Sequence, residues 1–499
     1  MASGTTLDAG TADRTLANAV AITGTSTVDT NTGKTLTLGG VVSGSGTLTK
    51  IDSGTLLLSG ANTYTGGTTL SGGTIQVGTN TALGTGALAM AADTTLKSGT
   101  NNLTLANAVG ITGAGTRTVD TNGNALTLGG VVSGDGALAK TGTGTLTLTN
   151  ANTYSGGTTI NVGTLNVTNS SALGSGNVSV AAGGKLEVGA NNLTIANNIT
   201  LNGTTTNGAI FSNQPGAGVT TNLTGQITLN ATSNVSNNWN DKTLQLSGKI
   251  TGVGGLDFVL QPGQVGGRYL ITGATNDYAG ATSVTGNATG QWGWTGQAML
   301  YLGATNALPT TTALTLNYAD LYLNGQAQTL ASISGSGNFS VQNGSTNAAT
   351  LTLGSGNTTS TFSGTIKDNG ISVSNTSSSP ATVNGTVALT KIGTGTLTLS
   401  GNNTYTGATT LSAGTLKAGS ATGISSASTL NATGGVFDLN GFNATVAAVG
   451  VGNAAGTITN TASGSGTNTL TITNYNVNLA SLITDGSTAK TAVTMNSAG

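Results

Sequence analysis

The chain of 499 residues contains neither cysteine nor histidine. Without cysteine there can be no disulfide, no thiol nucleophile and no cysteine-ligated zinc, a usage that suits extracellular bacterial proteins. Without histidine the commonest general base and the commonest transition-metal ligand are missing. Enzyme mechanisms that depend on either side chain are therefore excluded.

Charge is also scarce, at 6% of residues against roughly 25% in an ordinary soluble protein. The 14 basic and 15 acidic residues give a formal net charge of -1 and form no basic cluster, so a nucleic-acid partner is not expected. No apolar run approaches the ~18 residues of a membrane helix, so no membrane span is expected in this chain. The opening residues, MASGTTLDAG, lack the basic and apolar regions of a signal peptide, so no leader is visible.

Glycine and β-forming residues dominate what remains. There are 81 glycines and only 4 prolines, and no Gly-X-Y period, which excludes collagen. Thr, Ser and Asn alternate with Leu, Val and Ile in runs of three to five residues, which is the pattern of short strands. Gly, Asn and Ser separate these runs, and Gly, Asn and Asp can supply positive φ angles at corners. The pattern predicts an all-β coil that turns every few residues.

Long phrases recur along the chain. LTLGGVVSGSGTLTK at residues 36–50 returns as LTLGGVVSGDGALAK at 126–140, an offset of 126 − 36 = 90 residues. GANTYTGGTTLSGGTIQVG at 60–78 returns in similar form from residues 150 and 401, and a looser copy, GATNDYAGATSV, occupies 273–284. A unit of this length divides into about four coils of roughly 22 residues, the size of one β-helical turn. We therefore expect a parallel β-helix of about 22 turns.

The repeats divide the chain into three predicted regions. Residues 1–203 hold two units of about 90 residues and part of a third, and residues 346–499 hold further repeats. Between them, residues 204–345 form a divergent β-helical region with longer loops. All three tryptophans and three of the four prolines fall there: Trp239, Trp292, Trp294, Pro215, Pro262 and Pro309.

Three segments resemble a known repeat. They are LTKIDSGTLLLSGANTYTGGTTLSGGTIQVG at 48–78, LAKTGTGTLTLTNANTYSGGTTINVGTLNV at 138–167 and LTKIGTGTLTLSGNNTYTGATTLSAGTLKAG at 389–419. They closely resemble the autotransporter-associated β-strand repeat of passenger domains in Gram-negative type V secretion. The resemblance implies a right-handed parallel β-helix at the bacterial cell surface or outside the cell. It also implies an adhesin or a biofilm or surface-structure protein, and it brings no catalytic residue.

Carboxylates offer little for catalysis or metal binding. The acidic residues are isolated, although Asp29 and Asp52, 52 − 29 = 23 residues apart, are separated by about one coil, whereas Asp120 and Asp135 are not. Turn capping is the simpler role for such residues. The Gly-Gly-x-Gly-x-Asp pattern of calcium-binding β-rolls lacks its aspartate here. We expect no enzyme, no metal site and no cofactor, although an enzyme on the same scaffold would show carboxylates converging on one face.

Aromatic residues suggest two kinds of role. The recurring Tyr64, Tyr154 and Tyr405 are predicted to be structural, each ring covering a corner with its hydroxyl bonded to a turn; exposed rings for sugar stacking are the alternative. Trp292 and Trp294 have the spacing of one strand face and lie close to Tyr301. These three form a candidate contact surface for a glycan or a neighbouring subunit, with a locally larger core or a packed loop as the alternative.

The favoured function is structural. A non-enzymatic extracellular β-helix with no visible polar cap is expected to associate head-to-tail with further copies, giving a surface fibre or matrix. The alternative is an autotransporter passenger that acts as a monomeric adhesin. Such an adhesin would display loops of residues 204–310 to glycans or to host or biofilm surfaces.

Overall fold

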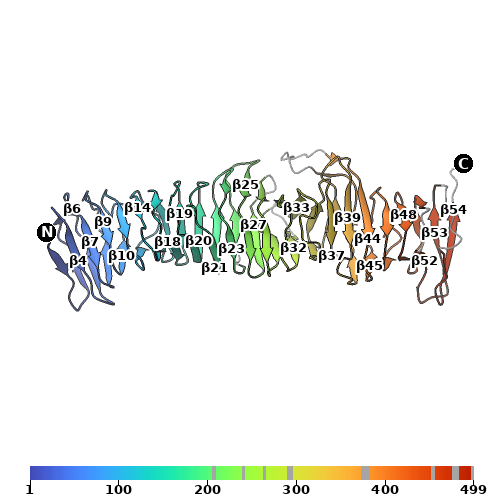
Figure 1. Ribbon diagram of the computed structural model, residues 1–499, viewed down its shortest axis with the longest axis horizontal. Helices are drawn as coiled ribbons and strands as arrows, with labels where there is room; N and C mark the ends of the chain where they lie inside the picture. Colours follow the sequence, from blue (N-terminus) through green and yellow to red (C-terminus); the bar gives the residue numbers. More distant parts are fainter. Residues whose placement is uncertain are drawn as a thin grey trace. The chain divides into compact units, whose positions relative to one another are not determined.

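The computed structural model shows a right-handed parallel β-helix of about 21 turns, which confirms the expected fold class (Figure 1). The structure describes residues 1–204, 209–238, 242–261, 264, 266–288, 296–371, 382–450, 456–474 and 483–495. Within these ranges one strand pair is antiparallel, β42 (Gly370–Ile371) with β43 (Thr382–Val383). No helix long and apolar enough to cross a membrane occurs in the same ranges.

The strands follow the alternation seen in the sequence. In β5 (Thr35–Leu38) the leucines are buried and the threonines are half-exposed, since successive side chains point to opposite faces. Corners fall at residues with positive φ. Ten of the twelve such non-glycine residues in the described part of the chain are Asn or Asp, Asp52 (φ 58°) and Asn122 (φ 50°) among them. The predicted turn chemistry is confirmed.

The chain forms two compact units. The first comprises Met1–Gly216 and Thr221–Ser233. One of its sheets contains β1 (Thr6–Asp8), β4 (Ser26–Asp29), β7 (Leu48–Ile51), β9 (Thr68–Leu70), β11 (Leu88–Met90), β14 (Val109–Gly110) and β17 (Val132–Ser133). A second ladder contains β2 (Arg14–Leu16), β5, β8 (Thr55–Leu58), β10 (Thr74–Val77), β12 (Thr95–Ser98), β15 (Thr116–Asp120), β18 (Ala137–Thr141), β20 (Thr158–Val167), β21 (Val178–Val188), β23 (Ile199–Leu201) and β26 (Ile227–Leu229). The remaining strands are β3 (Val20–Ala21), β6 (Val42–Ser43), β13 (Leu103–Leu105), β16 (Ala125–Leu128), β19 (Thr145–Leu148), β22 (Thr194–Ile195), β24 (Ile210–Ser212) and β25 (Thr220–Leu223).

The second unit comprises Ala217–Thr220 and Asn234–Gly499. One sheet contains β28 (Thr243–Leu246), β31 (Gly266–Ile271), β33 (Gln297–Leu302), β35 (Ala319–Tyr322), β38 (Ser340–Gln342) and β41 (Thr365–Ile366); another contains β36 (Ala327–Leu330), β39 (Ala349–Leu353), β44 (Val387–Lys391), β46 (Thr409–Leu411), β48 (Thr429–Ala432) and β51 (Ala448–Val449). A third contains β40 (Ser360–Phe362), β45 (Thr396–Leu399), β47 (Thr415–Ala418), β49 (Val436–Asp438) and β52 (Thr457–Thr459), and a fourth contains β50 (Ala444–Val446), β53 (Thr467–Ile472) and β54 (Lys490–Met495). The other strands are β27 (Ser233–Asn237), β29 (Ile250–Gly252), β30 (Leu256–Leu260), β32 (Thr282–Thr285), β34 (Ala313–Asn317) and β37 (Ser332–Ser336).

The long repeat is not a whole number of turns. Leu48 pairs with Thr68, and the same column continues through Leu88 and Val109 to Val132, four turns later. The residue that corresponds to Leu48 in the second copy is Leu138, six positions beyond Val132. Four turns therefore end six residues short of one repeat, so the unit spans slightly more than the expected four or so coils.

This excess moves strands of the second copy to another side of the helix. β6 pairs with β3, whereas its counterpart in the second copy, β17, pairs with β14 in the sheet of β7 and β9. β7 in turn belongs to that sheet, whereas its counterpart β18 pairs with β15 in the other ladder. In the first two copies, β6 and its counterpart β17, and β7 and its counterpart β18, therefore belong to different sheets.

Candidate functional site

The repeated tyrosine is an interior residue. Tyr64, Tyr154 and Tyr405 are fully buried, which excludes the exposed ring suited to sugar stacking. Each hydroxyl shares a hydrogen bond with the threonine four residues later, at 2.5, 2.6 and 2.7 Å respectively. The threonine opens the next strand, so the partner is a strand side chain and not the predicted turn. Burial raises the pKa of all three tyrosines to about 12.

The asparagine two residues before each tyrosine ties three successive turns together. The Asn62 side chain accepts a hydrogen bond from the Val42 amide (2.7 Å) and donates one to the Ala82 carbonyl (2.6 Å). Asn152 and Asn403 make the same two kinds of bond in their copies. A buried amide that satisfies backbone groups on both sides replaces ladder bonds that the loop cannot make.

A fourth copy exists in structure. Asn276 bridges the Ile250 amide and the Ala307 carbonyl, and the Tyr278 hydroxyl pairs with Thr282 at 2.6 Å. This is the looser phrase at residues 273–284. In its register Phe258 takes the position held by a lysine in the other copies, because Leu256 pairs with Thr282 as Leu48 pairs with Thr68.

That lysine lies inside the helix, which the sequence alone did not indicate. Lys50, Lys140 and Lys391 are buried, and each ammonium donates to backbone carbonyls around one corner. Lys391 bonds the carbonyls of Ile392 (2.6 Å), Gly393 (2.9 Å) and Ala413 (3.3 Å). Three donors on one flexible stem fit three converging carbonyls.

Burial shifts the titration of these lysines. It lowers the pKa of Lys50 to about 8, although the nearby Asp29 and Asp52 charges partly oppose the shift. It also lowers the pKa of Lys140 to about 8 and depresses that of Lys391. Each lysine therefore acts as an internal cap whose charged form is costly.

Asp29 and Asp52 do come close together, as their spacing allowed. Burial, followed by the charges of Asp52 and Asp8, raises the pKa of Asp29. Asp8 and Asp29 are direct neighbours on β1 and β4. Even so, the described residues contain no group of three or more acidic side chains placed to hold a metal ion.

Outer faces differ between the two units. In the first unit, one outward position carries Thr or Ser on nine of ten successive turns: Thr35, Thr55, Thr74, Thr95, Thr118, Ala139, Thr159, Ser179, Thr200 and Thr228. In the second unit, the matching kind of position on β33 and β35 carries Tyr301 and Tyr322. Their rings stack with centroids 4.3 Å apart and an interplanar angle of 11°.

The outward tyrosines are nevertheless buried, Tyr301 at 0% and Tyr322 at 2% exposure. Asp320 on the same face is 5% exposed and accepts a 2.5 Å hydrogen bond from Ser340, while burial raises its pKa. Tyr301 therefore cannot belong to an open contact surface. Trp292 and Trp294 lie outside the described residues, so their part of the contact hypothesis stays a prediction.

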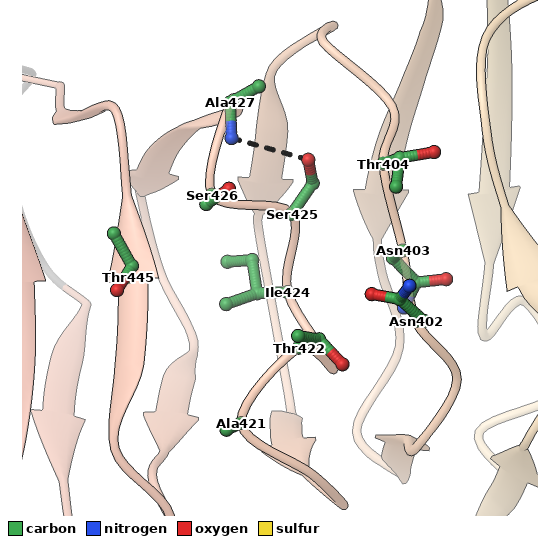
Figure 2. A pocket seen from close by; sticks show the side chains of 10 residues that line it. All are labelled: Asn402, Asn403, Thr404, Ala421, Thr422, Ile424, Ser425, Ser426, Ala427 and Thr445. Carbon is green, nitrogen blue, oxygen red and sulfur yellow. Dashed lines mark hydrogen bonds between the residues drawn. The ribbon is translucent and has the colours of Figure 1, made fainter.

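A small open pocket lies beside the third copy, in the second unit. It has a volume of about 230 Å³ and is lined by Asn402, Asn403, Thr404, Ala421, Thr422, Ile424, Ser425, Ser426, Ala427 and Thr445. Figure 2 shows the 402–404 segment on one side, with the loop of residues 421–427 facing it. Ser425 and Ile424 are buried, at 1% and 2% exposure, whereas Ser426 is exposed. No charged side chain lines the pocket.

A family model described as passenger-associated-transport-repeat matches residues 48–77, 138–167 and 389–418. The chain carries three copies of the autotransporter passenger repeat. The adhesin BmaC autotransporter of Brucella suis biovar 1 (strain 1330) is 41% identical to this chain over 133 residues. That match covers 27% of this chain and 4% of the relative's length. No solved structure matches the chain.

The passenger repeat provides interior structure in all three copies. Its tyrosine, asparagine and lysine point inward and bind the backbone or side chains of neighbouring turns. Because β7 and β18 belong to different sheets, the equivalent lysines Lys50 and Lys140 cannot line one continuous face. The geometry therefore argues against a repeated ligand contact and for a repeated structural unit.

Proposed function

We propose that this chain is part of an autotransporter passenger and acts outside the bacterial cell as a non-enzymatic adhesin scaffold. The observation that carries the proposal is the passenger repeat at three places, joined to the 41% identity with an autotransporter adhesin. The interior roles of the repeat residues support a scaffold. Specific contacts would then come from segments between the repeats.

Surface display and attachment test this proposal. Antibodies raised against the chain should label intact cells of its source, and the label should disappear after brief protease treatment of those cells. Beads coated with the purified chain should attach to host-cell or biofilm surfaces more than beads coated with heat-denatured chain. A label confined to permeabilised cells, or equal attachment by both kinds of bead, would contradict the proposal.

Head-to-tail association into a fibre remains a second proposal. Strand edges at the end of a β-helix can pair with strands of another copy. The net charge of -1 offers little repulsion between copies. Electron microscopy of concentrated protein should show filaments, and monomers alone at high concentration would refute this proposal.

Trp292 and Trp294 remain candidate contacts for a glycan or a neighbouring copy. Replacing both with alanine should weaken bead attachment or filament formation while the unfolding transition stays in place. Unchanged attachment and unchanged assembly would remove these residues from consideration.

A further inference from the structure

The turn after the tyrosine is closed tightly in the first two copies. The Thr85 amide donates to the Tyr64 carbonyl (3.0 Å), and the Ser175 amide donates to the Tyr154 carbonyl (3.0 Å). Glycine makes this approach possible. A Cβ at Gly84 (φ 61°) would lie 2.2 Å from the Tyr64 oxygen, and a Cβ at Gly86 would lie 2.4 Å from the Gly67 nitrogen. Neither position can accept a side chain without moving the loop.

The third copy lacks both glycines. Its asparagine bonds the Gly423 carbonyl as Asn62 bonds the Ala82 carbonyl, which aligns Ile424 with Leu83. Thr409 pairs with Leu430 as Thr68 pairs with Leu88, so the loop is one residue longer. The sequence between these points is SSAST at residues 425–429, against GTGA at residues 84–87. In the described part of the chain, no backbone amide reaches the Tyr405 carbonyl in the way that Thr85 reaches that of Tyr64.

The pocket opens at this changed loop. Its walls are the segment before Tyr405 and the loop of residues 421–427, the two segments that the glycine turn holds together in the earlier copies. Within the described residues, the side chains of Asn402, Thr404 and Ser426 make no hydrogen bond to the protein. They remain available to a ligand. Figure 2 shows the Ile424 side chain on the side of the loop away from the 402–404 segment, toward Thr445.

We propose that this pocket binds one uncharged sugar residue of a surface glycan. Amide and hydroxyl groups can both donate and accept hydrogen bonds, which suits the hydroxyls of a sugar. An acidic or cationic sugar would lose water without meeting an opposite charge. The volume of about 230 Å³ is below the roughly 300–1,000 Å³ of pockets for drug-sized ligands, so one ring fits.

The role of the pocket in attachment rests on the proposed adhesin function, but sugar binding does not. Glucose, galactose, N-acetylglucosamine and glucuronate can be tested with the purified chain by ligand-observed NMR. We expect at least one neutral sugar to bind with Kd on the order of 1–10 mM and glucuronate to bind at least tenfold more weakly. No binding by any neutral sugar, or tighter binding by glucuronate, would overturn the proposal.

Two variants locate the binding. Replacing Ser425–Thr429 with the Gly-Thr-Gly-Ala sequence of the first copy should close the pocket and abolish sugar binding. The matched control places Ser-Ser-Ala-Ser-Thr at residues 84–87 and should leave binding at residues 402–427 unchanged.

Should the closed variant fail to fold, N402L tests the same site and should weaken binding at least tenfold. Full binding by a folded closed variant, or by N402L, would place the sugar elsewhere and overturn the proposal. Bead attachment, measured separately, would distinguish failure of the pocket from failure of the adhesin function.

Discussion

The first and third copies of the passenger repeat share an interior and differ at the surface. In both, the tyrosine hydroxyl meets a threonine, the asparagine bridges the neighbouring turns and the lysine binds three carbonyls. The turn that follows is tight and glycine-rich in the first copy, but longer and free of glycine in the third. The repeat therefore specifies how turns stack, and the residues between repeats specify what the surface offers.

The outer faces of the two units show the same separation on a larger scale. Thr and Ser form a nearly unbroken outward ladder in the first unit, beside an outward position that carries Lys97 and Asp120. In the second unit, stacked tyrosines and a buried carboxylate occupy outward positions on a parallel sheet of the same geometry. The strands pair in the same way with either set of outward side chains, because the hydrogen bonds of the ladder involve only main-chain groups.

Truncating the tyrosine should give the largest effect, and an equal one in both copies. Tyr64→Ala and Tyr405→Ala each remove a fully buried ring, which should lower the free energy of unfolding by about 3–5 kcal/mol. Urea unfolding followed by circular dichroism provides the measurement. If the two substitutions lower the free energy of unfolding by amounts that differ by more than about 2 kcal/mol, the interiors of the two copies are not equivalent.

Substitutions in the turn should affect the stability of the first and third copies differently. Gly84→Ala introduces a Cβ 2.2 Å from a carbonyl oxygen at a φ of 61°, and we expect a loss of about 2 kcal/mol. Ser425 is not among the described residues with a positive φ, so Ser425→Gly should cost less than about 1 kcal/mol, mainly through unfolded-state entropy. The urea unfolding midpoints of the two variants measure these two losses. Similar losses at both positions would contradict the account of the pocket.

Much of the fold could be predicted from local patterns. The alternation in TTL and TIQV places Leu70, Ile75 and Val77 inside, and all three are fully buried. Asn and Asp at turn positions take the positive φ expected of them. These features depend on a few adjacent residues, and such residues are visible in a sequence.

Features set by distant turns could not be predicted in the same way. Lys50 resembles an exposed charge in sequence, and only the stacked turns reveal carbonyls on both sides of its ammonium. The rotation of successive copies depends on the length of each turn, which is fixed by the pairing of Leu48 through to Val132 and not by any motif. The pocket likewise results from two segments that meet across one turn.

The buried lysines should make stability rise with pH above neutrality. Between the folded pKa of about 8 for Lys50 and Lys140 and the usual value of 10.5, the unfolded chain binds more protons, so raising the pH favours the folded state. Each pKa difference of one corresponds to about 1.4 kcal/mol. Above about pH 10 the tyrosines reverse this trend, since their folded pKa of about 12 exceeds the unfolded value.

Urea midpoints measured from pH 7 to pH 11 should therefore pass through a maximum between about pH 9 and 10. Lys140→Met should flatten the rising limb and leave the falling limb unchanged, because it removes one lysine and no tyrosine. A midpoint that declines steadily from pH 7 would refute the internal position of the lysines.

The smallest effect should come from the tyrosine hydroxyl alone. Tyr64→Phe and Tyr405→Phe keep the ring and remove the hydroxyl that bonds Thr68 at 2.5 Å or Thr409 at 2.7 Å in the native protein. We expect a loss of about 1 kcal/mol in each copy, measured as a shift in the urea midpoint.

Double variants show whether the changed turn affects this hydroxyl pair. Tyr64→Phe with Thr68→Val, and Tyr405→Phe with Thr409→Val, remove both partners. In the first copy the double variant should recover part of the loss, because no hydroxyl is then left unpaired. In the third copy recovery should be smaller, since Thr409 also bonds Ser428 at 2.9 Å. Equal recovery in both copies would show that the changed turn does not reach the interior of the repeat.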